Sequence, residues 1–310
     1  MREAVVRLEQ TINSVFLGKP RVVRLVMTTF FAGGHLLLED VPGVGKTILA
    51  RTLARAVQGE FARIQCTPDL LPSDILGTSV FHQVSGEFEF KPGPIFRNVV
   101  LADEINRTTP RTQSALLEAM NEASISLDGV THPLPAPFTV LATQNPYEFE
   151  GTYPLPESQL DRFLMRLSVG YPGAEDEMRM LKDQREEHPL DRVTPVLDCE
   201  DVLAIQGAAR KVRFDDSLRG YLLSIVQATR SHARVRIGIS PRGSLGLQRA
   251  AQTHAFLEDR DYVVPDDVKG LAVPVLAHRL VPASTLPDDS EIGERRRIMK
   301  EILEEIEVPL

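Results

Sequence analysis

Hydrophobic residues between positions 35 and 170 fall into five short, continuous runs rather than into a strictly alternating pattern. Continuous runs are typical of strands that are covered on both faces, as in a parallel sheet wrapped by helices. The pattern therefore predicts an α/β fold with a five-stranded parallel sheet sandwiched by helices. The five runs are HLLLED (35–40), FARIQC (61–66), NVVLADE (98–104), FTVLATQN (138–145) and RFLMRLSVG (162–170).

Two further segments alternate between polar and apolar residues and interrupt the series of runs. VFHQVSGEFEF carries Ser85-Gly86 at its centre, and SISLDGVTHPL carries Asp128-Gly129. Small turn residues between β-forming residues indicate hairpins. Neither hairpin belongs to a minimal nucleotide-binding sheet.

The pattern changes after the Gly- and Pro-containing stretch VGYPGAEDE, and from about residue 198 the apolar spacing is helical throughout. One such helix opens with Ser240 as a cap and Pro241 in its first turn. We therefore predict a nucleotide-binding sheet domain over 1–172, a linker over 173–197 and a smaller all-helical lid domain over 198–310.

The amino-terminal stretch MREAVVRLEQTINSVFLG is charged throughout and has apolar residues at helical spacing. This pattern predicts an amphipathic helix and not a signal peptide. No apolar run approaches the roughly 20 residues of a membrane span, so we expect a cytoplasmic protein. The apolar positions of this helix are Val5, Leu8, Ile12, Val15 and Phe16.

Composition narrows the classes of partner. The chain has 310 residues, of which 43% are hydrophobic and 25% charged, as expected for a globular protein of two domains. Its net charge of -8 disfavours a protein that neutralises nucleic-acid phosphates, so no direct nucleic-acid contact is expected. Cys66 and Cys199 stand alone, and the seven histidines are scattered, which argues against a His/Cys metal site.

The stretch EDVPGVGKT joins a predicted strand to a predicted helix. It is either a phosphate-binding loop or a tight turn that happens to hold a lysine. The P-loop pattern asks for glycine at both ends, and Asp40 stands at the first position. We expect this departure to matter little, because aspartate tolerates unusual backbone angles better than most residues. The residues that would form the anion cradle are Pro42, Gly43, Val44, Gly45, Lys46 and Thr47.

Within this loop, the Lys46 ammonium can lie between the β- and γ-phosphates of ATP, and the Thr47 hydroxyl can bind Mg²⁺. Further along the chain, the strand NVVLADEIN ends in two acids, which are costly at the end of a buried strand unless they serve a cation or a reaction. Asp103 can hold the Mg²⁺ shell, and Glu104 can activate or orient the attacking water. A solvated strand end is the alternative.

Three other polar residues are candidates. Asn145 follows the strand FTVLATQN and can bond the γ-phosphate or the attacking water, since ligands bind at this edge of parallel sheets; a simple turn before Pro146 is the alternative. Arg162 lies at a helix end without an evident partner, and Arg242 lies in the first turn of a lid helix. A cation is unfavourable near a helix N-terminus unless an anion is close, which for Arg242 would be ATP. For Arg162 it would be ATP bound to a neighbouring subunit, and surface ion pairs are the alternative for both.

The motifs EDVPGVGKT, VVLADEINR, TQNP, LPESQLDRFLM and SPRG occur in the order and spacing of AAA+ ATPases, and together they closely resemble the MoxR family over nearly the whole chain. The resemblance implies a P-loop NTPase sheet of order 5-1-4-3-2, a helical lid and assembly into a ring that is usually hexameric. The hairpins would be the insert in the second helix and the hairpin before the amide sensor. Asp40 is similar to a loop variant common in that family.

The resemblance also implies residue roles. Lys46 and Thr47 match the phosphate and Mg²⁺ positions, and Asp103 and Glu104 match the metal-shell and water-activating acids. Asn145 matches the first sensor, and Arg162 and Arg242 match the trans-acting finger and the second sensor; Arg166 is a weaker candidate finger. ATP and Mg²⁺ are the implied cofactors. Chaperone-like remodelling of a protein client, often with a von Willebrand factor A-type partner, comes from the resemblance alone.

Two other functions remain open at this point. One is the motor subunit of a magnesium-chelatase-like machine, whose sheet domain carries similar inserts. The other is a nucleotide-dependent assembly scaffold with negligible hydrolysis, against which Glu104, Asn145 and Arg162 all argue. The acidic balance of the chain disfavours a DNA-tracking motor.

Overall fold

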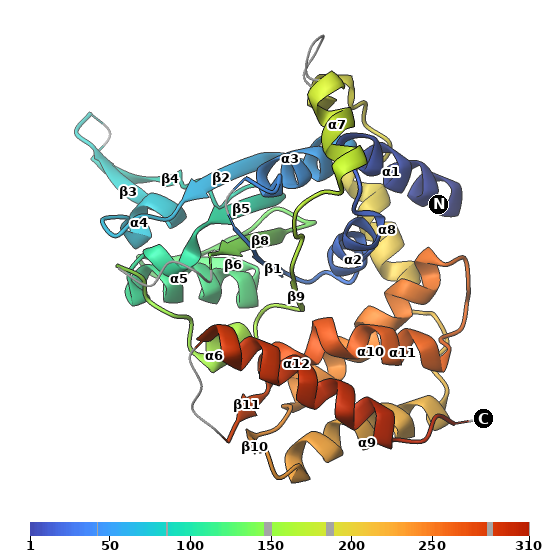
Figure 1. The fold of residues 1–310 in the computed structure, drawn as a ribbon. Helices are drawn as coiled ribbons and strands as arrows, with labels where there is room; N and C mark the ends of the chain where they lie inside the picture. The colour runs from blue at the N-terminus through green and yellow to red at the C-terminus, as the bar shows by residue number, and fades with distance from the viewer. Residues whose placement is uncertain (42, 85, 146–150, 184–188, 284–287, 310) are drawn as a thin grey trace.

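The centre of the protein is a five-stranded parallel sheet (Figure 1). The structure is a computed structural model that describes residues 1–41, 43–84, 86–145, 151–183, 189–283 and 288–309. Counting the five central strands along the chain, their spatial order is 2-3-4-1-5, which is the expected order 5-1-4-3-2 in reverse. From one edge to the other, the strands are β2 (Phe61–Gln65), β5 (Val99–Asp103), β8 (Thr139–Gln144), β1 (Leu36–Glu39) and β9 (Met165–Leu167).

Burial follows the predicted pattern in the middle of the sheet and departs from it at one edge. Strand β1 is buried throughout, and β5 and β8 are buried except at their last residues. Strand β2 is buried only at Ile64, because an edge strand is covered less fully than a central one.

Helices cover both faces of the sheet (Figure 1). On one face, Leu36 and Leu38 join an apolar cluster shared by the amino-terminal helices and the carboxy-terminal helical region. On the opposite face, Leu37 packs in a second cluster with α5. The predicted amino-terminal helix is confirmed, and all five of its apolar positions are buried. The helices are α1 (Arg2–Val15), α2 (Pro20–Phe31), α3 (Lys46–Ala56), α4 (Pro72–Leu76), α5 (Pro110–Glu122) and α6 (Glu157–Leu160).

Both predicted hairpins are present beside the main sheet. The first pairs β3 (Gly77–His82) with β4 (Glu87–Pro92), and Gly86 in its turn has a φ of +72°. Ser85 lies outside the described residues. The second hairpin pairs β6 (Ser124–Leu127) with β7 (Val130–Pro133). Asp128 and Gly129 both have positive φ there, as a two-residue hairpin turn requires.

The carboxy-terminal region is helical, as predicted, with one exception. Strands β10 (Val235–Ile237) and β11 (Val281–Pro282) form a small antiparallel pair, so the expectation of an all-helical domain is wrong at this point. Strands of two or three residues are too short to give a periodic signal. The helices are α8 (Cys199–Ala209), α9 (Asp216–Ser231), α10 (Pro241–Leu257), α11 (Pro265–Leu276) and α12 (Asp288–Glu305).

The predicted linker contains helix α7 (Ala174–Asp183), which projects from the body of the molecule (Figure 1). The domain boundaries themselves stay a prediction. The Ser240 hydroxyl accepts a hydrogen bond from the Gly243 amide, which confirms the predicted cap of α10. In the described parts of the chain, no helix is both long enough and apolar enough to cross a membrane.

Candidate functional site

A cavity of about 350 Å³ lies where β1, β5 and β8 end at the same edge of the sheet. It brings together residues from the glycine loop and from the ends of two other strands, although these segments are up to a hundred positions apart in the sequence. Its described lining residues are Gly43, Gly45, Lys46, Thr47, Ile48, Arg63, Asp103, Glu104 and Asn145.

The glycine loop adopts backbone angles that favour glycine. Gly43 and Gly45 have φ values of +89° and +86°, a region that L-residues rarely adopt. A Cβ at Gly45 would lie 3.1 Å from the Phe16 ring, whereas the space around Gly43 is open. Val44 is buried in the core and anchors the loop, and Pro42 lies outside the described residues. The open side of the loop therefore faces the cavity.

Helix α3 begins at Lys46, directly after the loop. The Lys46 ammonium donates a hydrogen bond to the Asp40 carbonyl oxygen at 2.9 Å, which holds it at the mouth of the loop. Burial lowers the pKa of Lys46, and Asp103, Asp40 and Glu104 oppose that shift. A buried cation at a helix N-terminus suits a bound phosphate group.

Asp40 has a structural role that the sequence did not reveal. Its φ is not positive, so the expected tolerance of unusual backbone angles is not what it provides. Instead, its buried carboxylate accepts hydrogen bonds from the Ser168 hydroxyl at 3.1 Å, from the Gly170 amide at 3.0 Å and from the Val169 amide. The residue at the first loop position thus ties the loop to the segment that follows β9.

We predict that Asp40→Ala lowers the free energy of unfolding by about 3 kcal/mol, because hydrogen bonds to a charged group contribute about 1.5–3 kcal/mol each and are not additive. Urea unfolding followed by circular dichroism measures the change. Asp261→Ala, which removes an exposed aspartate, is the matched control. An equal effect of the two substitutions would show that the Asp40 carboxylate does not hold the loop.

Asp103, at the end of β5, is fixed by neighbours on both sides. Its Oδ1 accepts a hydrogen bond from the Thr143 hydroxyl at 2.6 Å, and its Oδ2 accepts one from Arg63 Nε at 3.1 Å. Arg63 was not identified from the sequence. Its only signal there is a cation within a strand, and the pairing depends on the register of β2 against β5, which places Arg63 next to Asp103's strand.

Glu104 follows Asp103 in a left-handed conformation, with a φ of +58°. Such angles are strained for a residue with a side chain and concentrate at functional sites. The Glu104 amide donates to the Thr143 hydroxyl at 2.8 Å, and its Oε2 accepts from Arg107 at 2.9 Å and from Gln65 at 3.3 Å. These contacts hold the carboxylate at the rim of the cavity.

The residues of the cavity fit Mg²⁺ and a nucleotide phosphate chain. Hydroxyl and carboxylate oxygens, which Thr47 and Asp103 supply, are the ligands that Mg²⁺ prefers. Lys46 and the open glycine loop offer the charge and the close backbone approach that phosphates need. Asn145 is 6% exposed and lines the same cavity, at the end of β8. In the described chain, no group of three or more His, Cys, Asp or Glu residues could hold a metal ion.

None of the three arginines predicted as site residues lines this cavity. Arg166, whose side chain is 9% exposed, forms a two-bond ion pair with Glu39 of β1, at 2.9 Å for one of the bonds. Arg162 donates to the Leu117 carbonyl oxygen at 2.6 Å, and its Nε is buried without a hydrogen-bond partner among the described residues. It has no ion pair in the described part of its own chain. Arg166 is therefore ion-paired within its protomer, whereas Arg162 bonds a backbone carbonyl oxygen.

Arg242 lies near Arg162 rather than near the glycine loop. Its guanidinium donates to Asn121 Oδ1 of α5 at 3.1 Å and lies 4.0 Å from the carboxylate of Asp161, the residue before Arg162. The expectation that Arg242 answers ATP bound to its own chain finds no support in this arrangement. Both arginines belong to one surface, formed by α5, α6 and the start of α10.

Two family models match the chain. Residues 35–165 match the ATPase family associated with various cellular activities (AAA), and residues 227–302 match the AAA lid domain. With the sheet order and the glycine loop described above, these matches define an AAA-class ATPase with a helical lid. A crystal structure of a protein assigned as an ATPase from Cytophaga hutchinsonii superimposes with a TM-score of 0.90, at 38% sequence identity, covering 100% of this chain and 96% of that one.

Comparison with individual relatives identifies the family within this class of ATPases. The chain is 43% identical to Chaperone MoxR1 of Mycobacterium tuberculosis, over 87% of this chain and 74% of the relative. It is 33% identical to Protein MoxR of Methylorubrum extorquens, over 90% and 88% of the two chains. It is 50% identical to the uncharacterized protein YeaC of Bacillus subtilis, over 96% and 93%. The chain belongs to the MoxR family of AAA+ ATPases.

Proposed function

We propose that the protein binds ATP with Mg²⁺ and hydrolyses it in a homo-oligomeric ring, a hexamer, that remodels or matures a protein complex. The observation that carries this proposal is the single cavity that joins Lys46, Thr47, Asp103, Glu104 and Asn145. In it, Lys46 and the loop amides bind phosphate, Thr47 and Asp103 serve the metal, and Glu104 and Asn145 orient water.

The protein client and a von Willebrand factor A-type partner are proposed from the MoxR family, and we place the protein in the cytoplasm. A relative named Chaperone MoxR1 and another named Protein MoxR favour this function over a magnesium-chelatase-like motor. Phosphate release in the presence of Mg²⁺, and its loss in EDTA, tests hydrolysis directly. A protein that binds ATP without releasing phosphate would instead be an assembly scaffold.

We further propose that Arg162 and Arg242 both act on ATP held by the neighbouring subunit. Two observations support this: they share one surface through Asp161, and neither lines the cavity of its own chain. Arg279 donates to Asp161 Oδ1 at 2.7 Å and positions that carboxylate between the two segments. A head-to-tail ring brings such a surface against the cavity of the next copy.

Lys46→Ala should weaken ATP binding about 10- to 150-fold, which corresponds to the 1.5–3 kcal/mol typical of a hydrogen bond to a charged group. Fluorescence titration with a labelled ATP analogue measures the affinity. Lys211→Ala, which removes an exposed lysine outside the cavity, is the matched control. Unchanged affinity of the Lys46 variant would contradict the assignment of the loop.

A further inference from the structure

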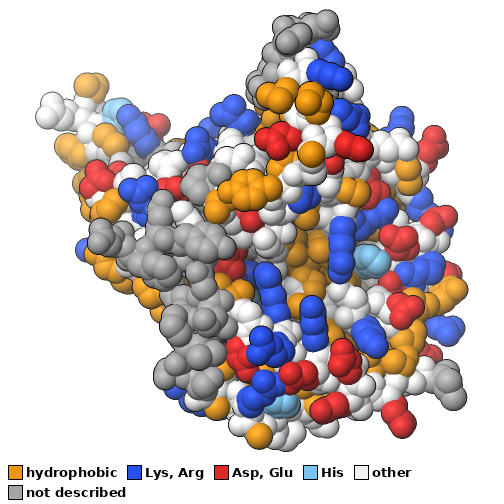
Figure 2. All heavy atoms as spheres, in the orientation of Figure 1, with side chains coloured by type: hydrophobic (Ala, Val, Ile, Leu, Met, Phe, Trp, Pro, Cys, Tyr) orange, Lys and Arg blue, Asp and Glu red, His pale blue; other side chains and the backbone are white. Residues whose placement is uncertain are grey.

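A second, larger cavity of about 540 Å³ lies between α2, β9, α11 and α12. It shares no described lining residue with the cavity at the glycine loop. In Figure 2, Lys and Arg side chains gather around a hollow on this face, over α2, β9 and α12. No acidic residue occurs among the described lining residues, although the chain as a whole carries a net charge of -8.

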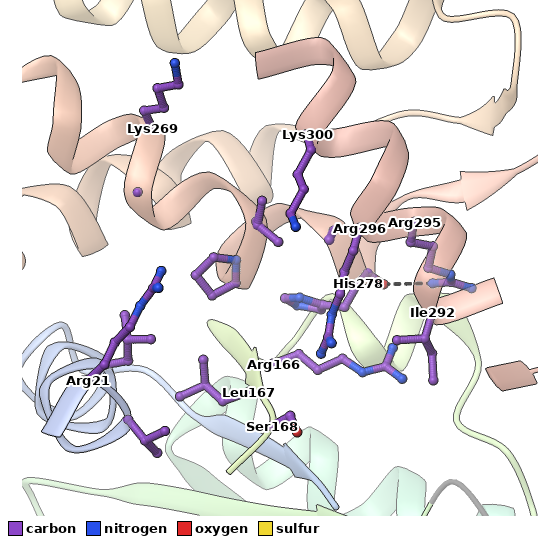
Figure 3. A pocket seen from close by; sticks show the side chains of 16 residues that line it. Arg21, Arg166, Leu167, Ser168, Lys269, His278, Ile292, Arg295, Arg296 and Lys300 are labelled. Atoms are coloured by element: carbon purple, nitrogen blue, oxygen red, sulfur yellow. Dashed lines mark hydrogen bonds between the residues drawn. The ribbon is translucent and has the colours of Figure 1, made fainter. Parts of the chain in front are cut away.

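Three of the cations that line this cavity have no counterion among the residues that the structure describes. Arg21 approaches from α2, and Arg296 and Lys300 extend from α12 toward the same space (Figure 3). Among the described residues, none of the three has a hydrogen bond or ion pair. By contrast, Arg297 on the adjacent face of α12 pairs with Glu294 at 3.4 Å. Arg295, which also lines the cavity, lies 3.7 Å from Glu157. Arg296 and Lys300 are thus the cations of α12 without an ion pair in the described part of the chain.

The positions of these cations are unfavourable without an anion. Arg296 and Lys300 are four residues apart on one helix, a spacing at which like charges destabilise by about 0.2–0.5 kcal/mol. Arg21 lies in the first turn of α2, where the helix dipole also disfavours a cation and where no acidic residue is present. Three unpaired cations around one hollow create a strong local positive potential. A ligand with several negative charges removes all of these penalties at once.

The floor of the cavity suits a ligand with an apolar part. Val22, Leu25, Val273 and Pro274 line it with aliphatic surface. His278, which is 2% exposed, also lines it, and its Nε2 is bonded to the Phe163 carbonyl oxygen at 3.1 Å. Burial and nearby arginines lower the pKa of His278 well below its usual value, so the ring is neutral and Nδ1 is an acceptor.

That acceptor has no hydrogen-bond partner among the described residues. A free inorganic anion such as tripolyphosphate brings charge but neither an apolar group nor a sugar hydroxyl. An acidic peptide brings carboxylates spaced along a chain, whereas the cavity has the size of a small-molecule site. A nucleotide carries both features that the lining calls for: a compact polyanion and an apolar base.

We propose that this cavity is a second nucleotide site, which binds a nucleoside polyphosphate with its phosphates among Arg21, Arg296 and Lys300 and its base on the aliphatic floor. The site borders the glycine loop without belonging to it. Ser168 lines the cavity and also donates to Asp40, and Arg166 lines it and pairs with Glu39. A ligand here would therefore contact β9 and Ser168, the first residue of the segment that holds the start of the loop.

Equilibrium dialysis with labelled ATP tests the proposal by stoichiometry. The wild-type protein should bind two nucleotides per protomer, and a variant with Arg296→Gln and Lys300→Gln should bind one. In a Lys46→Ala background, the remaining binding should weaken at least tenfold when these two changes are added. A control variant with Arg297→Gln and Lys211→Gln, which removes two charges outside the cavity, should leave this remaining ATP binding unchanged. Tripolyphosphate should displace the bound ATP more effectively than adenosine.

Three results would overturn the proposal. A wild-type stoichiometry of one would show that no second site exists, or that this cavity is the far end of the first. Binding in the Lys46→Ala background that ignores Arg296→Gln and Lys300→Gln would place the second nucleotide elsewhere. Displacement by polyglutamate at lower concentration than by tripolyphosphate would identify a surface for an acidic peptide. Equal melting temperatures of the variants exclude misfolding as a cause of lost binding.

Discussion

Glu104→Gln should leave ATP affinity near that of the wild-type protein and slow hydrolysis about 10²- to 10⁴-fold, the range associated with a positioned general base. The substitution keeps the size of the side chain and its acceptor oxygen, so the contacts with Arg107 and Gln65 can persist. Only the negative charge that draws a proton from water is lost. Because nucleotide binding precedes that step, we expect kcat to fall while affinity is preserved.

Steady-state phosphate release and titration with a labelled ATP analogue measure the two quantities separately. Glu118→Gln makes the same chemical change on an exposed position of α5 and should alter neither. Normal turnover of the Glu104 variant would remove this residue from the mechanism and direct attention to Asp103. The slow variant should also retain ATP and its client together, so affinity capture with it can identify the protein on which the ring acts.

The central part of the fold could be predicted because its strands are buried on both sides. Continuous apolar runs at β1, β5 and β8 leave few alternatives to a covered parallel sheet. The spatial order of the strands could not be predicted in this way, because the sequence of a strand does not state which strand lies beside it. The predicted order came from the resemblance to AAA+ proteins. Helix α7 was missed because Gly and Pro before it indicated only a break, although Met178 and Leu181 stand at helical spacing within it.

The candidate site also has residues that could be predicted from the sequence and residues that could not. Lys46, Asp103 and Asn145 could be placed together from the sequence because each lies at the end of a parallel strand or just after it, and such ends meet at one edge of the sheet. The residues that support them could not. The contact of Arg63 with Asp103 and the pairing of Arg166 with Glu39 depend on strand register. No local pattern encodes register between segments forty or more residues apart.

The difference between local sequence pattern and strand register also explains why the structure revises the interpretation of Arg162 and Arg166. From the sequence, Arg162 and Arg166 are one helical turn apart and equally basic, so either can be a finger. Only the structure shows that Arg166 is buried against Glu39, where losing its charge would leave an unpaired buried carboxylate. Arg162 has no ion pair among the described residues and bonds only the Leu117 carbonyl oxygen, so we keep it as the candidate finger.

Arg162→Ala should bind ATP normally and hydrolyse it about 10³- to 10⁵-fold more slowly, the effect of arginine fingers in GTPase systems. That loss corresponds to roughly 4–7 kcal/mol of the activation barrier. The reason is that a guanidinium from the neighbouring subunit stabilises charge that develops only in the transition state. Arg111→Ala, which removes an exposed arginine at the start of α5, is the matched control and should retain activity.

Mixing two inactive variants tests whether the finger acts between subunits. Lys46→Ala subunits cannot hold ATP well but carry an intact Arg162, and Arg162→Ala subunits have an intact cavity. In a shared ring, the first can complete the cavity of the second, so the mixture should recover part of the wild-type rate while each variant alone stays inactive. Recovery should rise with the fraction of mixed neighbours and disappear when the two proteins are assembled separately before mixing.

The decisive observation is the activity of rings that demonstrably contain both variants, as shown by two distinguishable affinity tags. Because Arg162 also bonds the Leu117 carbonyl oxygen, its loss can disturb α5, and the melting temperature of Arg162→Ala shows whether it does. If mixed rings form, both proteins are folded and the mixture is still inactive, Arg162 does not act across the interface. Arg242, which lies on the same surface and has an exposed guanidinium, then becomes the group to test by the same mixing experiment.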